Sequence, residues 1–354
     1  MSPRHQRRLA WRDAAFVGAV WFALALIGLA AFRPQAAAAG WLIGFTFWAQ
    51  ILIGSLTLIM IHRLTSGRWG EIIAPALQTA AASVPVLLVL AIPVFIALPL
   101  LYPWSQRPDA IKPDVLSYYL NAPSYIGRTL IALFGWSALA LLLPRIAGRS
   151  GQILAALGLV FHALIISSVA VDWYLSLGAP FTSSSFGGSV AVSALVGALA
   201  WAAPSAPMRE DDPAVGDVGA LLLATILGIT YIDFMAVLVI WYGDIPREEI
   251  WFVARDHLPW SALAIAAFVL TSLLPVLALL LSRVRNRARP LRLVAGCVLV
   301  GLACYDAYLV APPSPGAALG AALLAIVGIG LALVGCFASG IENLVSSREP
   351  ANAR

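Results

Sequence analysis

The sequence predicts an all-α polytopic membrane protein of about ten transmembrane helices, and three observations carry that prediction. Of the 354 residues, 61% are hydrophobic and only 11% are charged, whereas soluble domains carry about 25% charged residues. The mean hydropathy is +0.90. Apolar runs recur along the whole chain, so no stretch of about 100 residues is left over for a soluble catalytic domain. These observations exclude a tethered enzyme whose active site lies outside the membrane.

Each span is predicted from an apolar run bounded by turn or charge signals. A bilayer core about 30 Å thick needs roughly 20 apolar residues per helix. Prolines, glycines and charges, as in Arg33-Pro34 and the APPSPG sequence at 311–316, separate the runs. The first run follows a basic stretch without a small-residue cleavage site, so we expect a retained span and not a signal peptide. Ten segments qualify: 14–32, 41–62, 76–101, 124–144, 152–177, 186–203, 217–242, 259–282, 291–310 and 316–338.

The basic residues predict the orientation. Of the 22 basic residues, 21 are Arg, and they stand in short clusters at the ends of the apolar runs. An N-terminus on the cytoplasmic side places 16 of them in the cytoplasm and 6 outside, so both termini are expected to be cytoplasmic. This distribution explains the positive charge better than nucleic-acid binding does. Six tryptophans then fall near the outer ends of the helices and resemble an aromatic belt, namely Trp41, Trp104, Trp173, Trp241, Trp251 and Trp260.

Ionisable residues within the predicted spans include His162, Asp172, Asp233 and Asp306. Such groups cost several kcal/mol in a bilayer unless they are paired or hydrated, so each is a candidate for function. At 1.5 Å per residue, His162 lies about 16 Å into its span, Asp172 about 31 Å, Asp233 about 24 Å and Asp306 about 21 Å, all measured from the inner end. A histidine near the midplane followed by acids biased outward is the layout of a proton half-channel open to the outer face. The alternative is that each acid only bonds a neighbouring helix or ends at the interface.

Polar neighbours strengthen these candidates as a proton path or a quinol site. Ser168, Asp172 and Ser176 follow at i, i+4 and i+8, and Thr230 shares a helix face with Asp233. Asp306 stands between Tyr305 and Tyr308, whose hydroxyls could bind a proton carrier or a quinone head group.

The sequence offers no ligand set for a metal or haem. Cys297, Cys304 and Cys336 have no CxxC spacing, and they are expected to be small buried apolar residues. His62 and His162 differ in depth by about 15 Å, too far to ligate one haem iron. No phosphate loop, nucleotide fingerprint, Ser/His/Asp set or HExxH motif occurs either.

Several stretches carry a resemblance to a known family, in order HRLTSGRWG at 62–70, the corner Leu101-Tyr102-Pro103-Trp104, the run 161–188 with its Asp-Trp and serine-rich loop, IWYGDIPREEIWFVAR at 240–255, SLLPVLALLLSR at 272–283 and YDAYLVAP at 305–312. These stretches resemble the NrfD/polysulfide reductase-like membrane subunits, and more closely the ActF-type subunit of alternative complex III, a bacterial quinol:cytochrome c oxidoreductase. The resemblance covers about residues 40–312 and departs from the family pattern at Tyr174 and Leu175.

The resemblance implies an architecture and a role. It implies one membrane domain over 1–354 built of two four-helix bundles, about 41–177 and about 186–310, with flanking helices near 14–32 and 316–338. It further implies a chain without its own cofactor in the bacterial inner membrane, with structural work, proton conduction or a contribution to a quinol or menaquinol site. Roles carry over to Asp172, Asp306, the serines at 183–185 and the loop 243–255. The implied partners are a related NrfD-like membrane subunit, an iron–sulfur subunit, a haem c subunit, lipids and a terminal oxidase.

Two classes of function therefore remain open from the sequence. The first is a subunit of a respiratory complex, either this one or another redox complex with an NrfD-like quinol-binding subunit. The second is a stand-alone ion or solute transporter, which favours broken helices at corresponding places in two halves. Pro85, Pro93 and Pro99 interrupt the third span and Pro275 the eighth, which are not corresponding places.

Overall fold

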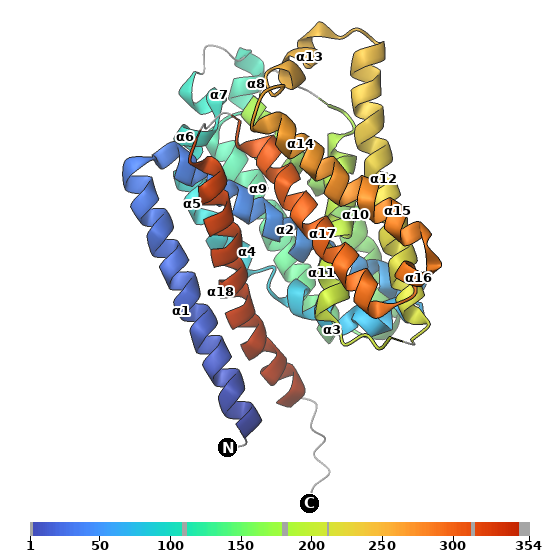
Figure 1. Cartoon of the computed structure of the whole chain (residues 1–354). Helices are drawn as coiled ribbons and strands as arrows, with labels where there is room; N and C mark the ends of the chain where they lie inside the picture. Colours follow the sequence, from blue (N-terminus) through green and yellow to red (C-terminus); the bar gives the residue numbers. More distant parts are fainter. Residues whose placement is uncertain (1–2, 108–111, 179–182, 211, 313–315, 347–354) are drawn as a thin grey trace, which may run out of the picture.

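The computed structural model describes the backbone of residues 3–107, 112–178, 183–210, 212–312 and 316–346 (Figure 1). It is 86% helical, and the described residues form no strand. The prediction of an all-α polytopic membrane protein is confirmed. The long helices are α1 (Pro3–Phe32), α2 (Pro34–Thr65), α3 (Arg68–Ala82), α9 (Ala122–Leu142), α10 (Gly148–Trp173), α11 (Phe186–Ser205), α12 (Ala214–Tyr242), α17 (Ala288–Val310) and α18 (Ala318–Ser346). The short ones are α4 (Val86–Leu90), α5 (Ile92–Ile96), α6 (Leu98–Leu101), α7 (Pro103–Gln106), α8 (Pro113–Tyr118), α13 (Pro246–Val253), α14 (Trp260–Phe268), α15 (Leu274–Leu280) and α16 (Ser282–Arg285), with 3₁₀ turns η2 (Leu143–Arg145) and η3 (Leu175–Gly178) and the π-helical turn η4 (Val269–Leu273).

The third predicted span is not one straight helix. In the described part of the chain, nine helices are long and apolar enough to cross a membrane, or ten if one bent pair counts as a span. That pair joins Arg68–Ala82 to Val86–Ile96 with a bend of 44°. Pro85, Pro93 and Pro99 account for the breaks, because proline lacks the amide hydrogen that a helix interior needs and clashes with the preceding turn. The segment predicted as a single span over 76–101 is therefore a run of short helices.

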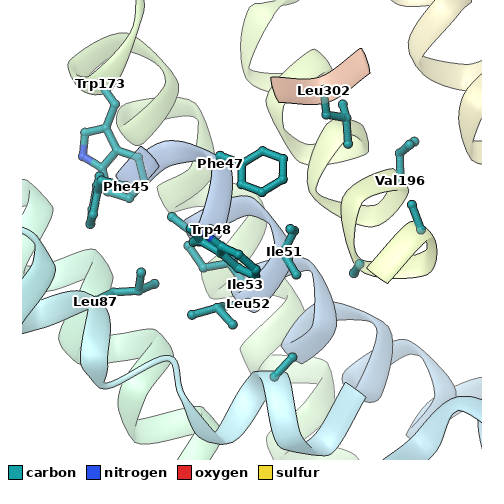
Figure 2. Close-up of a cluster of buried hydrophobic side chains, with 14 of the residues drawn as sticks. Phe45, Phe47, Trp48, Ile51, Leu52, Ile53, Leu87, Trp173, Val196 and Leu302 are labelled. Atoms are coloured by element: carbon teal, nitrogen blue, oxygen red, sulfur yellow. The ribbon is translucent and has the colours of Figure 1, made fainter. Parts of the chain in front are cut away.

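Helix α2 is the centre of the molecule. In its most apolar stretch, 94% of the residues are buried, which is the largest share among the candidate spans. It contacts α3, α10, α11, α17 and α18. Figure 2 shows Phe45, Phe47 and Trp48 of α2 among apolar side chains from α4, α10, α11 and α17. A helix that is apolar on every side is thus surrounded by others, as expected for a helix without a polar face.

Small residues let other helices approach α2 closely. A Cβ atom at Gly54 would overlap the carbonyl group of Ala194 on α11, and one at Gly44 would lie 2.6 Å from the Cβ of Ala325 on α18. Helix α18 packs against α2 and α1 packs against α18, so both termini lie on the same side of the molecule (Figure 1). Close backbone approach at small residues is a main source of attraction between membrane helices, because lipid tails are as apolar as the helices themselves.

Replacing Gly54 with Leu is expected to separate α2 from α11 and to prevent stable folding. The added side chain has nowhere to go, because the atom it meets first is backbone. Gly296→Leu on α17 is the matched control, since no atom lies within 4 Å of a Cβ added there. Monodispersity in detergent and the melting temperature measure both variants. A Gly54→Leu protein as stable as Gly296→Leu would contradict this account of the interface.

Two predictions about individual side chains are wrong. Trp104, Trp173 and Trp260 are buried, so the six tryptophans do not form a lipid-facing belt; the Trp173 ring, for example, packs against Phe45 of α2 with ring centroids 4.8 Å apart. Cys297 is exposed and Cys304 half-exposed, while the side chain of Cys336 lies outside the described residues. An apolar thiol faces lipid as readily as it faces the protein interior.

Candidate functional site

Asp172 forms a buried ion pair at the end of α10. The Arg128 guanidinium on α9 holds it with two hydrogen bonds, Nη2 to Oδ1 at 2.7 Å and Nε to Oδ2 at 2.8 Å. The Asp172 side chain is 1% exposed and that of Arg128 is 19% exposed. Two parallel bonds of this kind fix both position and orientation of the carboxylate.

Aromatic side chains surround this ion pair. The Arg128 guanidinium lies 3.7 Å above the Tyr119 ring, and Nη2 also donates to the Tyr119 carbonyl oxygen at 2.9 Å. The Tyr119 hydroxyl lies 3.4 Å from Ser168 Oγ, and burial raises the pKa of this tyrosine above its usual value. Nearby, the hydroxyls of Tyr102 and Tyr125 are 2.8 Å apart. Tyr102 belongs to the Leu-Tyr-Pro-Trp corner. This motif therefore packs close to Asp172.

The predicted polar stripe on α10 ends earlier than expected. The helix stops at Trp173, and Ser176 lies in the following 3₁₀ turn η3. Its hydroxyl donates to the Asp172 carbonyl oxygen at 2.8 Å, so Ser176 closes the helix end and does not extend the stripe. Ser168 contacts Tyr119, as described above. Residues 179–182 of the serine-rich loop lie outside the described residues.

Asp306 lies in a second buried site, between α17 and α2. Gln50 Nε2 donates to Asp306 Oδ2 at 2.7 Å, and the Tyr174 hydroxyl donates to Oδ1 at 3.2 Å. Asp306 is 2% exposed and Gln50 is also buried. These bonds join segments that are 256 and 132 residues apart in the sequence. Asp306 therefore ties α17 to the central helix.

Asp233 occupies a third site, between α12 and α11. Ser189 Oγ donates to its Oδ1 at 2.7 Å. The Tyr305 side chain on α17 is a second hydrogen-bonding partner of the carboxyl group. Thr230, one turn earlier on α12, donates to Ser272 Oγ at 2.8 Å. Thr230 and Asp233 share a helix face, as the spacing predicts.

Tyr305 connects the second and third sites. It interacts electrostatically with Asp233, with Asp306 and with Tyr308, and Tyr174 interacts with it as well as with Asp306. Asp306 and Asp233 thus belong to one group of buried and half-buried polar side chains, drawn from α2, α11, α12 and α17 and from Tyr174 directly after α10. No described hydrogen bond joins this group to Asp172, so the three predicted acids form two separate sites.

A cavity of about 280 Å³ lies beside Asp233. Tyr305 and Tyr308, three residues apart, both line it, whereas Asp306 is turned about 100° away on the helix and faces α2. The remaining walls come from α11, α12, α14, η4 and α17: Ser193, Ile229, Thr230, Asp233, Phe234, Val237, Ala264, Ala267, Phe268, Thr271, Ser272 and Leu302. Above it, the Arg255 guanidinium lies 3.7 Å from the Trp251 ring and 6.0 Å from the Tyr308 ring, and burial lowers the pKa of Arg255 to about 10.

His162 stands apart from all of these groups. It is buried with its ring centroid 5.9 Å from that of Trp136, and its Nδ1 has no hydrogen-bond partner among the described residues. His62 Nε2 lies 2.9 Å from the Gly67 carbonyl oxygen at the other end of α2. Among the described residues, no three His, Cys, Asp or Glu side chains are grouped to hold a metal ion.

The partners of the acids were not predicted from the sequence, although two of them carried a signal. Gln50 is a lone amide in the middle of a long apolar span, and Arg128 is a lone cation inside another. Both satisfy the same criterion that selected the acids, since a strongly polar group at membrane depth needs a partner. Ser189 and Tyr174 carried no such signal, because a hydroxyl can bond its own helix.

The fold and these sites define a multi-pass membrane protein with two buried carboxyl-containing sites and a cavity beside one of them. Comparison with known protein families and with curated proteins finds no match to this chain.

Proposed function

We propose that the chain is a cofactor-free integral membrane subunit of a respiratory quinol:cytochrome c oxidoreductase of the alternative complex III class, in which buried acids transfer protons. The observation that carries the proposal is the position of Tyr305, which interacts with the carboxyl groups of both Asp233 and Asp306. A carboxyl group at membrane depth is costly and points to function unless it is paired with a charge. Asp172 has such a pair in Arg128, whereas the described partners of Asp233 and Asp306 are neutral.

The group around Tyr305 has the chemistry that proton transfer needs. Tyrosine and serine hydroxyls each donate and accept hydrogen bonds, and a carboxyl group does both when protonated. Ser189 donates to Asp233 and Tyr174 donates to Asp306, and Tyr305 interacts electrostatically with Asp233, Asp306 and Tyr174. Tyr174, Asp233 and Asp306 lie toward the ends of α10, α12 and α17, and Ser189 lies near the start of α11. The arginine distribution assigns these helix ends to the outer side of a bacterial inner membrane. Protons released from quinol oxidation would leave on that side.

The choice of complex rests on the resemblance of residues 40–312 to the ActF-type subunits. On that basis the redox centres belong to partners, an iron–sulfur subunit and a haem c subunit, beside a related NrfD-like membrane subunit. The Asp172–Arg128 pair and its aromatic neighbours then have a structural role in this chain, because a buried bidentate ion pair holds α9 against α10.

Purification of the tagged full chain from native membranes tests the proposal. A subunit of such a complex should bring haem c absorbance and an iron–sulfur electron paramagnetic resonance signal in fixed proportion to itself. The Gly296→Leu variant, altered on an open helix surface, should bring the same partners. A colourless chain that purifies alone and moves an ion or solute in vesicles would contradict the proposal. That result would favour the stand-alone transporter.

A further inference from the structure

The cavity beside Asp233 contains polar groups that the protein itself leaves without partners. Ser193 Oγ on α11 and Thr271 Oγ1 on η4 are buried, line the cavity, and have no hydrogen-bond partner among the described residues. A buried hydroxyl without a partner costs roughly 1–3 kcal/mol, so such groups are rare unless a ligand or water bonds them. Two of them in one apolar cavity indicate a binding site.

The cavity opens toward the lipid. Phe234 and Val237 on α12 and Phe268 on α14 line it, and all three are among the exposed large apolar side chains of the molecule. Because these helices face the bilayer, the surface outside the cavity is hydrocarbon. A ligand would therefore enter sideways from the membrane.

Proline explains why the Thr271 segment departs from a regular helix. Pro275 has no amide hydrogen to donate to the Thr271 carbonyl oxygen, and the chain forms the π-helical turn η4 just before it, in which Leu274 N donates to Val269 O. Gly301 on α17 accommodates this turn, since an added Cβ would overlap Thr271. Single π-helical turns inside α-helices occur often at functional sites.

The residues that line the cavity determine which kind of ligand fits. No Arg, Lys or His is among the residues that line the cavity in the described part of the chain. The Arg255 guanidinium lies outside the lining and over the Trp251 ring, so the lining itself offers an anionic lipid phosphate no counter-charge. Phe234, Phe268, Tyr305 and Tyr308 offer ring faces and edges to a planar ring. Hydroxyls from three helices, Ser193, Thr230 and Thr271, suit a head group with polar atoms at more than one place. A volume of about 280 Å³ lies just below the range for small-molecule pockets, about 300–1,000 Å³, and suits a ring head group with its tail left in the lipid.

We propose that this cavity binds the uncharged ring head of a membrane quinol or quinone, with Ser193 and Thr271 as hydrogen-bonding residues and Asp233 at its edge. The proposal deepens the proposed function and rests on it for the choice of ligand. It assigns quinol binding to α11, α12, α14 and α17, on the lipid-facing side of the group around Tyr305. A bound quinol would then lie next to the carboxyl group that accepts its proton.

Photolabelling of the purified complex tests this site. The probe is a naphthoquinone that carries an azide on its ring and a short isoprenoid chain, and labelled peptides are mapped by mass spectrometry. We expect labels within 229–237, 264–272 and 302–308, and we expect excess unlabelled naphthoquinone to remove them. A long-chain alcohol at the same concentration should not compete.

Matched variants separate the cavity from the general lipid surface. Ala264→Trp fills the cavity and should abolish labelling, whereas Ala262→Trp, at an exposed position of the same helix, should leave it unchanged. Ser193→Ala and Thr271→Val should each weaken competition by unlabelled naphthoquinone about 3- to 10-fold, the loss of one hydrogen bond. Thr225→Val on α12 is their control, because that hydroxyl bonds carbonyl groups of its own helix. Melting temperatures show that each variant is folded.

The outcomes distinguish this proposal from the proposed function. Labels that survive in Ala264→Trp, or that the alcohol removes equally well, would overturn the quinol site whatever the partners are. If the chain purifies without redox partners and is still labelled and competed at these peptides, the respiratory-complex proposal fails while the quinol site stands. Unaltered competition in both Ser193→Ala and Thr271→Val would also overturn the assignment.

Discussion

Replacing Arg128 with Leu is expected to destabilise the protein by about 3–5 kcal/mol, because it leaves the Asp172 carboxylate buried without a counter-charge. The pair is bidentate and the carboxylate is 1% exposed, so water cannot replace the guanidinium. The melting temperature and the folded yield in detergent measure the effect. Arg68→Leu is the control, since its contact with Asp212 is 3.9 Å long and the two side chains are 65% and 34% exposed, a pair worth about 0–1 kcal/mol.

A double variant separates the cost of an unpaired charge from the value of the pair. Arg128→Leu combined with Asp172→Leu removes both charges, and it should recover most of the lost stability, because well-packed apolar side chains often replace a buried ion pair without loss. A double variant as unstable as the single one would show that the unpaired Asp172 carboxylate is not the cause of the loss.

Replacing Asp306 is expected to have two different effects, depending on the new side chain. Asp306→Leu leaves the Gln50 amide and the Tyr174 hydroxyl buried without an acceptor, at a cost of about 1–3 kcal/mol each, and assembly should fail. Asp306→Asn keeps an acceptor oxygen but cannot take up a proton. The complex should then assemble while quinol oxidation falls about 100-fold, the size of effect typical of losing a positioned proton-transfer group.

Quinol oxidation and proton release by the assembled complex measure this prediction. Asp114→Asn, at an exposed acid of α8, is the control for a lost negative charge. Normal turnover and normal proton release in an assembled Asp306→Asn complex would leave Asp306 as a hydrogen-bonded connection between α17 and α2.

The class of protein and the positions of the buried acids could be predicted from the sequence. Composition and run length determine an all-helical membrane protein, because only a closed set of backbone hydrogen bonds is stable in hydrocarbon and a helix makes them within itself. Asp172, Asp233 and Asp306 stand out for a related reason, since a charge in an apolar run is costly wherever the helix is placed. Prolines at 85, 93 and 99 also marked where the third span is broken. In the structure this span consists of separate short helices.

Only the tertiary structure decided which groups are partners and which helix faces are buried. In a soluble helix, polar residues mark the outer face, but a membrane helix meets apolar surroundings on every side. The apolar pattern therefore could not predict that Trp104 is buried and Cys297 exposed. It also could not predict that Tyr305 faces the cavity while Asp306 faces Gln50. Nor could spacing along the chain pair Asp306 with an amide 256 residues earlier. The local sequence determined how deep in the membrane each polar group lies. The packing of helices around α2 determined which residues each polar group contacts.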